Sequence, residues 1–127
     1  MVGSAMGITF KVDDARGIVF ADWTGDITVE DIARYWAALL SDQPAMACGR
    51  SITDLRNCTM QFTGEDLRKL AQGILEPAMK GRNWKTAVIV RNPLHYGVTR
   101  QHEMFSEGFM QTNVFYSEDL ARVWVLS

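Results

Sequence analysis

Residues 87–90 read Ala-Val-Ile-Val, an uninterrupted aliphatic run that constrains the fold more than any other part of the chain. A strand with one face in water alternates apolar and polar residues, whereas a strand covered on both faces is apolar throughout. Parallel strands between two helical layers have this second pattern. The run therefore predicts a strand in the middle of a sheet that belongs to an α/β fold.

Two segments carry the start signal of an amphipathic helix. Thr28 and Thr63 are each followed, three residues later, by an aspartate, which is the spacing of an N-terminal capping box. Apolar residues then recur at intervals of three and four over 29–40 and 67–78, so each helix has one face for the core. Pro77 lies inside the second pattern and is expected to end or kink that helix, because proline removes a backbone donor.

The remaining segments complete an alternation of strands and helices. Asp13 and Asp14 separate two short β-rich segments and form the expected tip of a hairpin, while Ser117 is a plausible N-cap for a closing helix. Residues 1–6 have no pattern and are treated as a flexible leader, so that residues 7–127 form a single domain. The alternation predicts an α/β fold with a mixed, partly parallel β-sheet of about five strands and packed helices. The expected order is ββαβαβαβα, with strands at 7–12, 17–23, 50–55, 87–90 and 113–116 and helices at 28–40, 63 to about 81, 94–110 and 117–124.

Charge and composition argue against several classes of partner. The 13 basic and 15 acidic residues give a net charge of -2, and no segment gathers enough Lys and Arg to neutralise a run of phosphates. No apolar run reaches the roughly 18 to 20 residues of a membrane-spanning helix, and the N-terminus does not have the pattern of a signal peptide. We therefore expect a cytoplasmic protein with no nucleic-acid partner and no membrane span.

Metal, cofactor and catalytic sites are not expected. Cys48 and Cys58 lie ten positions apart, and His95 and His102 do not complete a four-ligand zinc set with them. The chain has no glycine-rich phosphate loop and no nucleophile-elbow motif. The candidate lists for metal ligands, cofactors and catalytic residues are therefore empty.

Several short segments together form a recognisable order. They are Gly25-Asp26-Ile27-Thr28 with Asp31 and Tyr35-Trp36, then Asp54-Leu55-Arg56, Thr63 to Leu67, the run 87–90 leading to Tyr96-Gly97 and Arg100, and Val114-Phe115 followed by Ser117-Glu118-Asp119 and Trp124. This order resembles the STAS domain, the fold of bacterial anti-sigma-factor antagonists, and in particular its SpoIIAA-like branch, which is sometimes grouped with Sec14-type lipid-binding domains. The resemblance implies a non-enzymatic module that binds a partner or a small ligand, often as a homodimer.

One departure from the family concerns phosphorylation. The phosphorylated antagonists resemble one another in a serine or threonine within a motif of Asp-Ser-Ser-Gly type, placed where the third strand meets the second helix. Here that junction, residues 54–59, reads Asp-Leu-Arg-Asn-Cys-Thr, and the small-residue motif is missing. Thr59 is the nearest hydroxyl, and phosphorylation there would add nearly two negative charges at a helix start. An ordinary loop threonine is the favoured interpretation.

The best place for a polar ligand is the edge of the sheet where parallel strands end and loops lead into helices. The expected loops are 54–63 and 91–97. The alternative is that Asp54 pairs with a nearby arginine and only holds the two loops in place. The candidate binding residues of this rim are Asp54, Arg56, Asn57, Thr59, Tyr96 and Arg100, with Arg91, Asn92 and His95 beside them.

Soft apolar side chains are concentrated in the third expected helix. Met104 and Phe105 lie there, close to Phe109 and Met110, and Met60 and Phe62 could join them. Such residues usually form core, but a deformable pocket or partner surface uses the same types.

Three functions follow from these patterns. The leading one is a regulatory or interaction module of STAS/SpoIIAA-like type, acting on an unknown protein partner or a small ligand and homodimeric, which a patch of exposed Met and Phe would support. The second is a carrier of an apolar, lipid-like small molecule. The third is an enzyme that uses the rim of Asp54, Arg56 and Tyr96.

Overall fold

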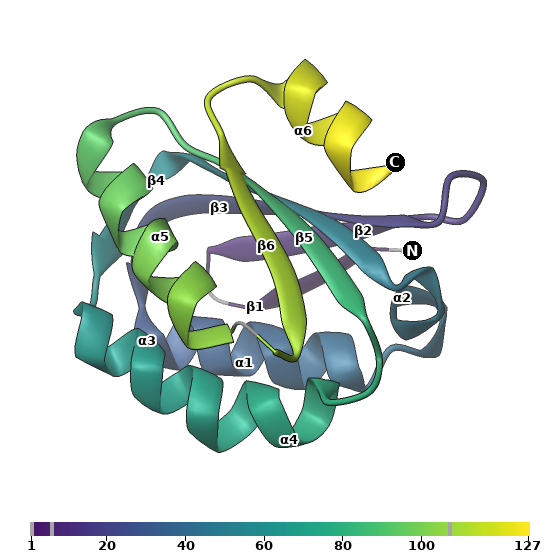
Figure 1. The fold of residues 1–127 in the computed structure, drawn as a ribbon, viewed down its shortest axis with the longest axis horizontal. Helices are drawn as coiled ribbons and strands as arrows, with labels where there is room; N and C mark the ends of the chain where they lie inside the picture. The colour runs from purple at the N-terminus through teal and green to yellow at the C-terminus, as the bar shows by residue number, and fades with distance from the viewer. Residues whose placement is uncertain (1, 6, 107) are drawn as a thin grey trace.

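The computed structural model of the protein describes residues 2–5, 7–106 and 108–127, with side chains for 7–100 and 108–127. Its strands form one six-stranded sheet in which each strand lies beside the next along the chain (Figure 1). β1, β2 and β3 pair antiparallel, whereas β3 to β6 run parallel. The strands are β1 (Val2–Ala5), β2 (Ile8–Asp13), β3 (Ile18–Thr28), β4 (Arg50–Gln61), β5 (Trp84–Ile89) and β6 (Met110–Phe115).

Helices cover the two faces of the sheet unequally. Figure 1 shows α1, α3 and α4 below the sheet, α5 beside β6, and α6 on the opposite face. Each parallel crossover carries helix, as the predicted alternation requires. The helices are α1 (Val29–Leu40), α2 (Gln43–Cys48), α3 (Gly64–Leu70), the π-helix η1 (Ala71–Leu75), α4 (Glu76–Met79), α5 (Pro93–Ser106) and α6 (Glu118–Val125).

Two hydrophobic clusters lie on the two faces of the sheet. The larger one, here called the helix-side core, packs β-sheet residues against α1, α3 and α5, and the Tyr35 ring lies edge-on to those of Trp23 and Trp36 within it. The smaller one, here called the α6-side core, consists of Ile18, Ile52, Ala87, Ile89, Ala121 and Val125.

The aliphatic run 87–90 lies in and directly after β5, and it is covered on both faces as predicted. Ala87 and Ile89 belong to the α6-side core, while Val88 and Val90 belong to the helix-side core. The predicted position in the middle of the sheet is wrong by one place, because the sheet has six strands and β3 and β4 are its central pair.

The additional strand is β1, formed by residues that the sequence analysis treated as a flexible leader. It pairs antiparallel with β2, with Val2 opposite Lys11 and Ala5 opposite Ile8. Backbone hydrogen bonds to an edge strand do not depend on a side-chain pattern, so this strand had no signal in the sequence.

The strand predicted at 50–55 is too short, and the loop expected at 54–63 is wrong for most of its length. β4 continues to Gln61 and pairs with β3, with Gly25 opposite Cys58 and Ile27 opposite Met60. Cys58 and Met60 pack on the helix-side core. Residues 57–61 therefore form strand because β3 offers a long partner, although their composition is polar.

Pro77 does not end the second long helix. The helical segment runs from α3 through η1 into α4 and stops at Met79. The π turn η1 directly precedes the proline, at the place where the ring and the missing N–H of Pro77 would disturb α-helical hydrogen bonds. Pro44 lies in the first turn of the short helix α2, where proline is tolerated.

Candidate functional site

Asp54 and Arg56 lie where β4 changes its register against β3. Asp22 is opposite Asp54, but Thr24 is opposite Asn57, so β4 contains one extra residue at this bulge. β5 ends at the same level, with Ile89 opposite Asp54. A bulge next to a strand end turns a side chain out of the regular alternation, and here it places Arg56 near Asp54.

The two side chains form a forked ion pair. Arg56 Nε donates to Asp54 Oδ1 at 3.0 Å, and Nη2 donates to Oδ2 at 2.8 Å. The Arg56 backbone N–H also donates to Oδ1 at 3.0 Å. Asp54 is 6% exposed, so this pair satisfies a nearly buried carboxylate with three hydrogen bonds.

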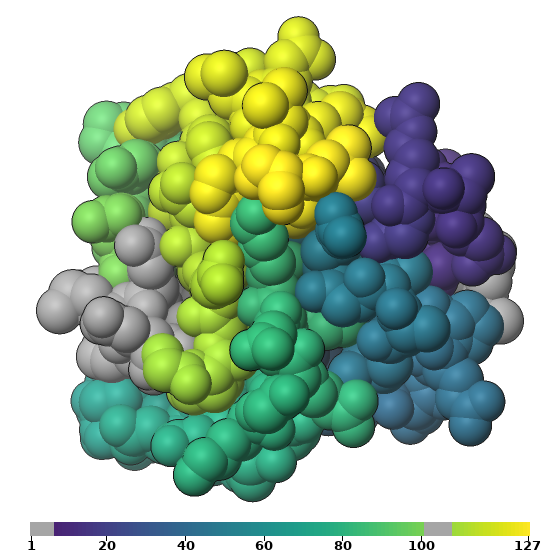
Figure 2. All heavy atoms as spheres, turned by 45° about the vertical axis from the view of Figure 1, so that its right-hand side comes forward, coloured from purple at the N-terminus to yellow at the C-terminus, as the bar shows by residue number. Residues whose placement is uncertain are grey.

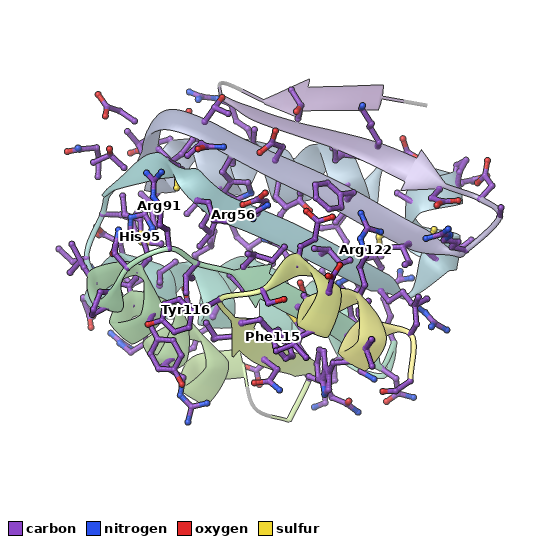
Figure 3. All side chains as sticks on the ribbon, turned by 90° about the horizontal axis from the view of Figure 1, so that it is seen from above. Arg56, Arg91, His95, Phe115, Tyr116 and Arg122 are labelled. Atoms are coloured by element: carbon purple, nitrogen blue, oxygen red, sulfur yellow. The ribbon has the colours of Figure 1, made fainter. Side chains whose placement is uncertain are left out.

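The pair continues onto helix α6. Arg56 Nη2 also donates to Glu118 Oε1 at 3.2 Å, and Arg122 Nε donates to Glu118 Oε2 at 3.1 Å. The Arg122 guanidinium in turn lies over the Phe20 ring, 5.5 Å from its centroid. Figure 3 shows Arg56 and Arg122 on the side of the sheet that α6 covers. The chain of charges therefore connects β4 to α6.

This environment fixes the charge of Asp54. Burial by itself raises the pKa of the Asp54 carboxyl, but the hydrogen bonds from Arg56 outweigh it and hold that pKa below its usual range. The pKa of Arg56 is raised, first by its hydrogen bond to Asp54. An ionised carboxylate with its lone pairs engaged is a poor proton acceptor, so the geometry matches the alternative in which Asp54 pairs with an arginine.

The structure does not bring the other rim candidates into this network. Asn57 and Thr59 are exposed on β4. The Tyr96 ring on α5 stacks on that of Tyr116, with centroids 5.6 Å apart. Arg100 is exposed on α5 and has interactions of its own. The candidates Met104 and Phe105 fall in α5 at positions whose side chains lie outside the described residues.

His95 connects α5 to β4. It is buried, its backbone N–H donates to the capping oxygen Asn92 Oδ1 at 2.9 Å, and its Nδ1 has no hydrogen-bond partner. Burial and the positive charge of Arg91 lower the pKa of His95, while the Leu55 carbonyl acts in the opposite direction. A neutral, buried imidazole at this position is a packing residue, and Figure 3 shows it next to Arg91.

A cavity of about 60 Å³ lies inside the helix-side core. Met60, Phe62 and Met110, which the sequence analysis considered for a deformable pocket, are among the residues that line it. The sequence analysis did not single out Trp23 and Tyr35 or three threonines, which line it as well. The threonines are Thr53 of β4, Thr86 of β5 and Thr99 of α5. The available signal was the presence of Thr53 and Thr86 at positions that strand alternation assigns to the core.

Helix α6 has an exposed apolar row on the side that faces away from the sheet. Leu120 and Val123 are 61% and 70% exposed, and Leu126 continues the row at the C-terminal end. Their spacing of three residues places them along one face of the helix. Figure 2 shows α6 at the surface of the molecule. Among the residues whose side chains the structure describes, no Met or Phe is among the exposed large apolar residues, while Met104 and Phe105 lie outside that part of the chain.

An open groove of about 550 Å³ borders α6. Arg122 forms one wall, and Phe20 and Ile18 contribute apolar surface from β3. Lys11, Asp13 and Asp14 from the β2–β3 hairpin lie on the other side. The groove therefore extends the α6 surface toward the hairpin with charges of both signs.

The described part of the chain contains neither a metal-binding cluster nor a membrane-spanning helix. Among those residues, no group of three or more His, Cys, Asp and Glu side chains is arranged to hold a metal ion. No described helix is both long and apolar enough to span a membrane.

Comparison with known proteins supports the fold through a solved structure. No protein-family model matches the chain, and no curated protein matches it. A solved structure of an uncharacterised protein from the DUF3478 family, with a SpoIIAA-like fold and from Shewanella loihica PV-4, aligns with a TM-score of 0.63 over 98% of each chain. The chain has a SpoIIAA-like fold. The sequence identity is 20%, so the likeness extends to the fold alone.

The SpoIIAA-like fold confirms the fold class predicted from the order of segments. Residues 54–59, which the sequence analysis compared with the phosphorylation motif of the antagonists, are part of the continuous strand β4. Thr59 lies opposite Asp26 of β3 and is not in the loop that was expected.

Proposed function

We propose that this SpoIIAA-like domain is a non-enzymatic interaction module that binds a second copy of itself through the outward face of α6. The observation that carries the proposal is the exposed apolar row of Leu120, Val123 and Leu126. Apolar side chains gathered on one helix face commonly mark a protein contact surface.

The composition of α6 supports this proposal. A helix that packs on a sheet needs one apolar face, and Ala121 and Val125 provide it by packing on the α6-side core. Leu120 and Val123 add a second apolar face that the monomer does not use. A contact with another molecule would bury this second face.

The charges on α6 favour a second copy as the partner. Glu118 and Asp119 lie in the first turn of the helix, and Arg122 lies in the last turn. In a twofold dimer the same patch meets itself, and an antiparallel pair of α6 helices would bring Asp119 of each copy toward Arg122 of the other. Opposite charges would then flank a shared apolar centre.

The two other functions considered from the sequence have less support. A cavity of about 150 Å³ holds one benzene molecule, so a cavity of about 60 Å³ is too small for a lipid acyl chain. The enzyme hypothesis needs a reactive group at the rim, but Asp54 is engaged by Arg56.

Replacing Leu120 with Glu is expected to weaken self-association. Sedimentation velocity over a range of concentrations should show a monomer–dimer equilibrium for the wild-type protein. The variant should have a dissociation constant at least about tenfold higher, because a charge would replace a central apolar contact.

Ile74→Glu is the matched control. Ile74 is an exposed apolar residue of η1, outside the α6 surface, and its replacement should leave the equilibrium unchanged. The proposal is wrong if the wild-type protein remains monomeric at every concentration, or if Leu120→Glu dimerises as tightly as the wild type.

A further inference from the structure

The cavity in the helix-side core is lined by apolar side chains and by three threonines. Val88 and Met110 of the sheet and Val98 of α5 contribute apolar surface. Thr53, Thr86 and Thr99 are buried threonines that also line it. Well-packed cores fill such positions with aliphatic side chains, so a space bordered by three threonines calls for another explanation.

A chain of hydrogen bonds ends at this cavity. Trp84 Nε1 donates to Ser51 Oγ at 3.2 Å, and Ser51 Oγ donates to Thr86 Oγ1 at 2.8 Å. An indole N–H can only donate, so Ser51 Oγ accepts from Trp84, and its own hydroxyl proton goes to Thr86 Oγ1. With Ser51 as the donor to Thr86 Oγ1, this chain of hydrogen bonds does not use the hydroxyl proton of Thr86. Thr99 differs, because its hydroxyl donates to the His95 carbonyl at 2.7 Å.

A donor without a partner lies in the same wall. Trp23 lines the cavity, and its buried Nε1 has no hydrogen-bond partner. A buried donor without an acceptor is unfavourable by about the cost of a lost hydrogen bond. None of the lining residues is Asp, Glu, Lys, Arg or His. The lining therefore offers no charged group that could balance a charged ligand, while Trp23 offers a donor that no acceptor in the described residues engages.

We propose that the cavity is a binding site for a small neutral molecule that carries one hydrogen-bond acceptor, such as a short ketone, aldehyde or ether. The Thr86 hydroxyl donates to the ligand oxygen, and the apolar wall holds the ligand's alkyl groups. This site is separate from the α6 surface and does not depend on the proposed dimer.

The volume sets the size of the ligand. The cavity has less than half of the roughly 150 Å³ that accommodate benzene. A molecule with about four non-hydrogen atoms is the appropriate scale, and acetone is a suitable probe. Isobutene has nearly the same shape, but a CH₂ group replaces the carbonyl oxygen, so the comparison isolates the acceptor.

The test is an NMR titration of the full chain with each probe. The methyl resonances of Val88 and Val98 report occupation of the cavity. Acetone and isobutene should both shift them. Only acetone should also shift the indole N–H resonance of Trp84, through the hydrogen-bond chain, and a Trp84→Phe sample assigns that resonance. This measurement uses the wild-type protein and so does not depend on how any variant folds.

Two threonine variants complete the test. Thr86→Val keeps the shape and removes the donor, so it should weaken acetone binding about fivefold and leave isobutene binding unchanged. Thr99→Val is the matched control, because its hydroxyl is already used within α5, and it should leave the ratio of the two affinities unchanged.

Two results would overturn the proposal. If neither probe shifts the valine methyls at saturating concentration, the cavity is not a ligand site. If both probes bind but Thr86→Val changes neither affinity, or changes both equally, the requirement for an acceptor is wrong.

Discussion

Replacing Val125 with Asp is expected to lower the free energy of unfolding by at least about 3 kcal/mol. Val125 is the last residue of α6, is fully buried, and packs with Ile52 and Ile89 in the α6-side core. The substitution removes apolar contacts and places a carboxylate where the core offers no partner. Urea denaturation followed by tryptophan fluorescence measures the loss, and Trp124 on the same helix reports whether α6 stays in place.

Val123→Asp is the matched control two residues away. Val123 is on the opposite side of α6 and is 70% exposed, so the free energy of unfolding should change by no more than about 0.5 kcal/mol. The same control should weaken self-association, because Val123 belongs to the exposed row. Equal losses of stability in the two variants would show that the inner and outer faces of α6 have been assigned incorrectly.

Local signals in the sequence predicted the helix starts well. Thr28 and Thr63 both form complete capping boxes, with Asp31 and Asp66 returning hydrogen bonds to the cap backbone. Ser117 accepts a hydrogen bond from the Leu120 backbone N–H at the start of α6. Each of these interactions spans three residues, so the chemistry that fixes it is present in a short stretch of sequence.

Strand lengths depended on partners distant in the sequence and were predicted poorly. The segment after Leu55 has the composition of a loop, but β3 extends far enough to pair with it up to Gln61. β1 likewise exists because β2 presents a free edge. Backbone hydrogen bonds stabilise both strand segments. Every residue except proline carries the same backbone donor and acceptor, so these bonds do not produce a pattern of residue types in the sequence.

In the candidate site, too, contacts between residues close in the sequence were predictable and contacts between distant residues were not. Asp54 and Arg56 are two residues apart, so an ion pair between them was a reasonable alternative from the sequence. Glu118 is 62 residues from Arg56, and only the packing of α6 on the sheet brings it near. The ligand cavity is harder still to predict, since Thr53, Thr86 and Thr99 come from two strands and a helix.

Replacing Arg56 with Met is expected to lower the free energy of unfolding by about 2 kcal/mol at pH 7. Methionine keeps most of the apolar contact of the arginine stem, but Asp54 loses the two guanidinium hydrogen bonds and becomes a nearly buried, unpaired carboxylate. Breaking a fully buried pair costs about 3 to 5 kcal/mol, and the lower figure applies because solvent reaches Arg56. Arg68→Met, which removes the exposed partner of Glu65, should have no measurable effect.

The pH dependence of that difference identifies its cause. The folded-state pKa of Asp54 is below its usual value, so the ion pair contributes stability that is fully present above the unfolded-state pKa of about 3.9 and is lost as the pH falls through the folded-state pKa. In Arg56→Met the burial of Asp54 is no longer offset, its pKa rises, and protonation on acidification relieves the unpaired charge. The stability difference between wild type and variant should therefore be largest near pH 7 and shrink as the pH falls to about 4 and below. Urea unfolding of both proteins at several pH values measures it, and a difference that stays constant across this range would mean that Arg56 stabilises the fold by packing alone.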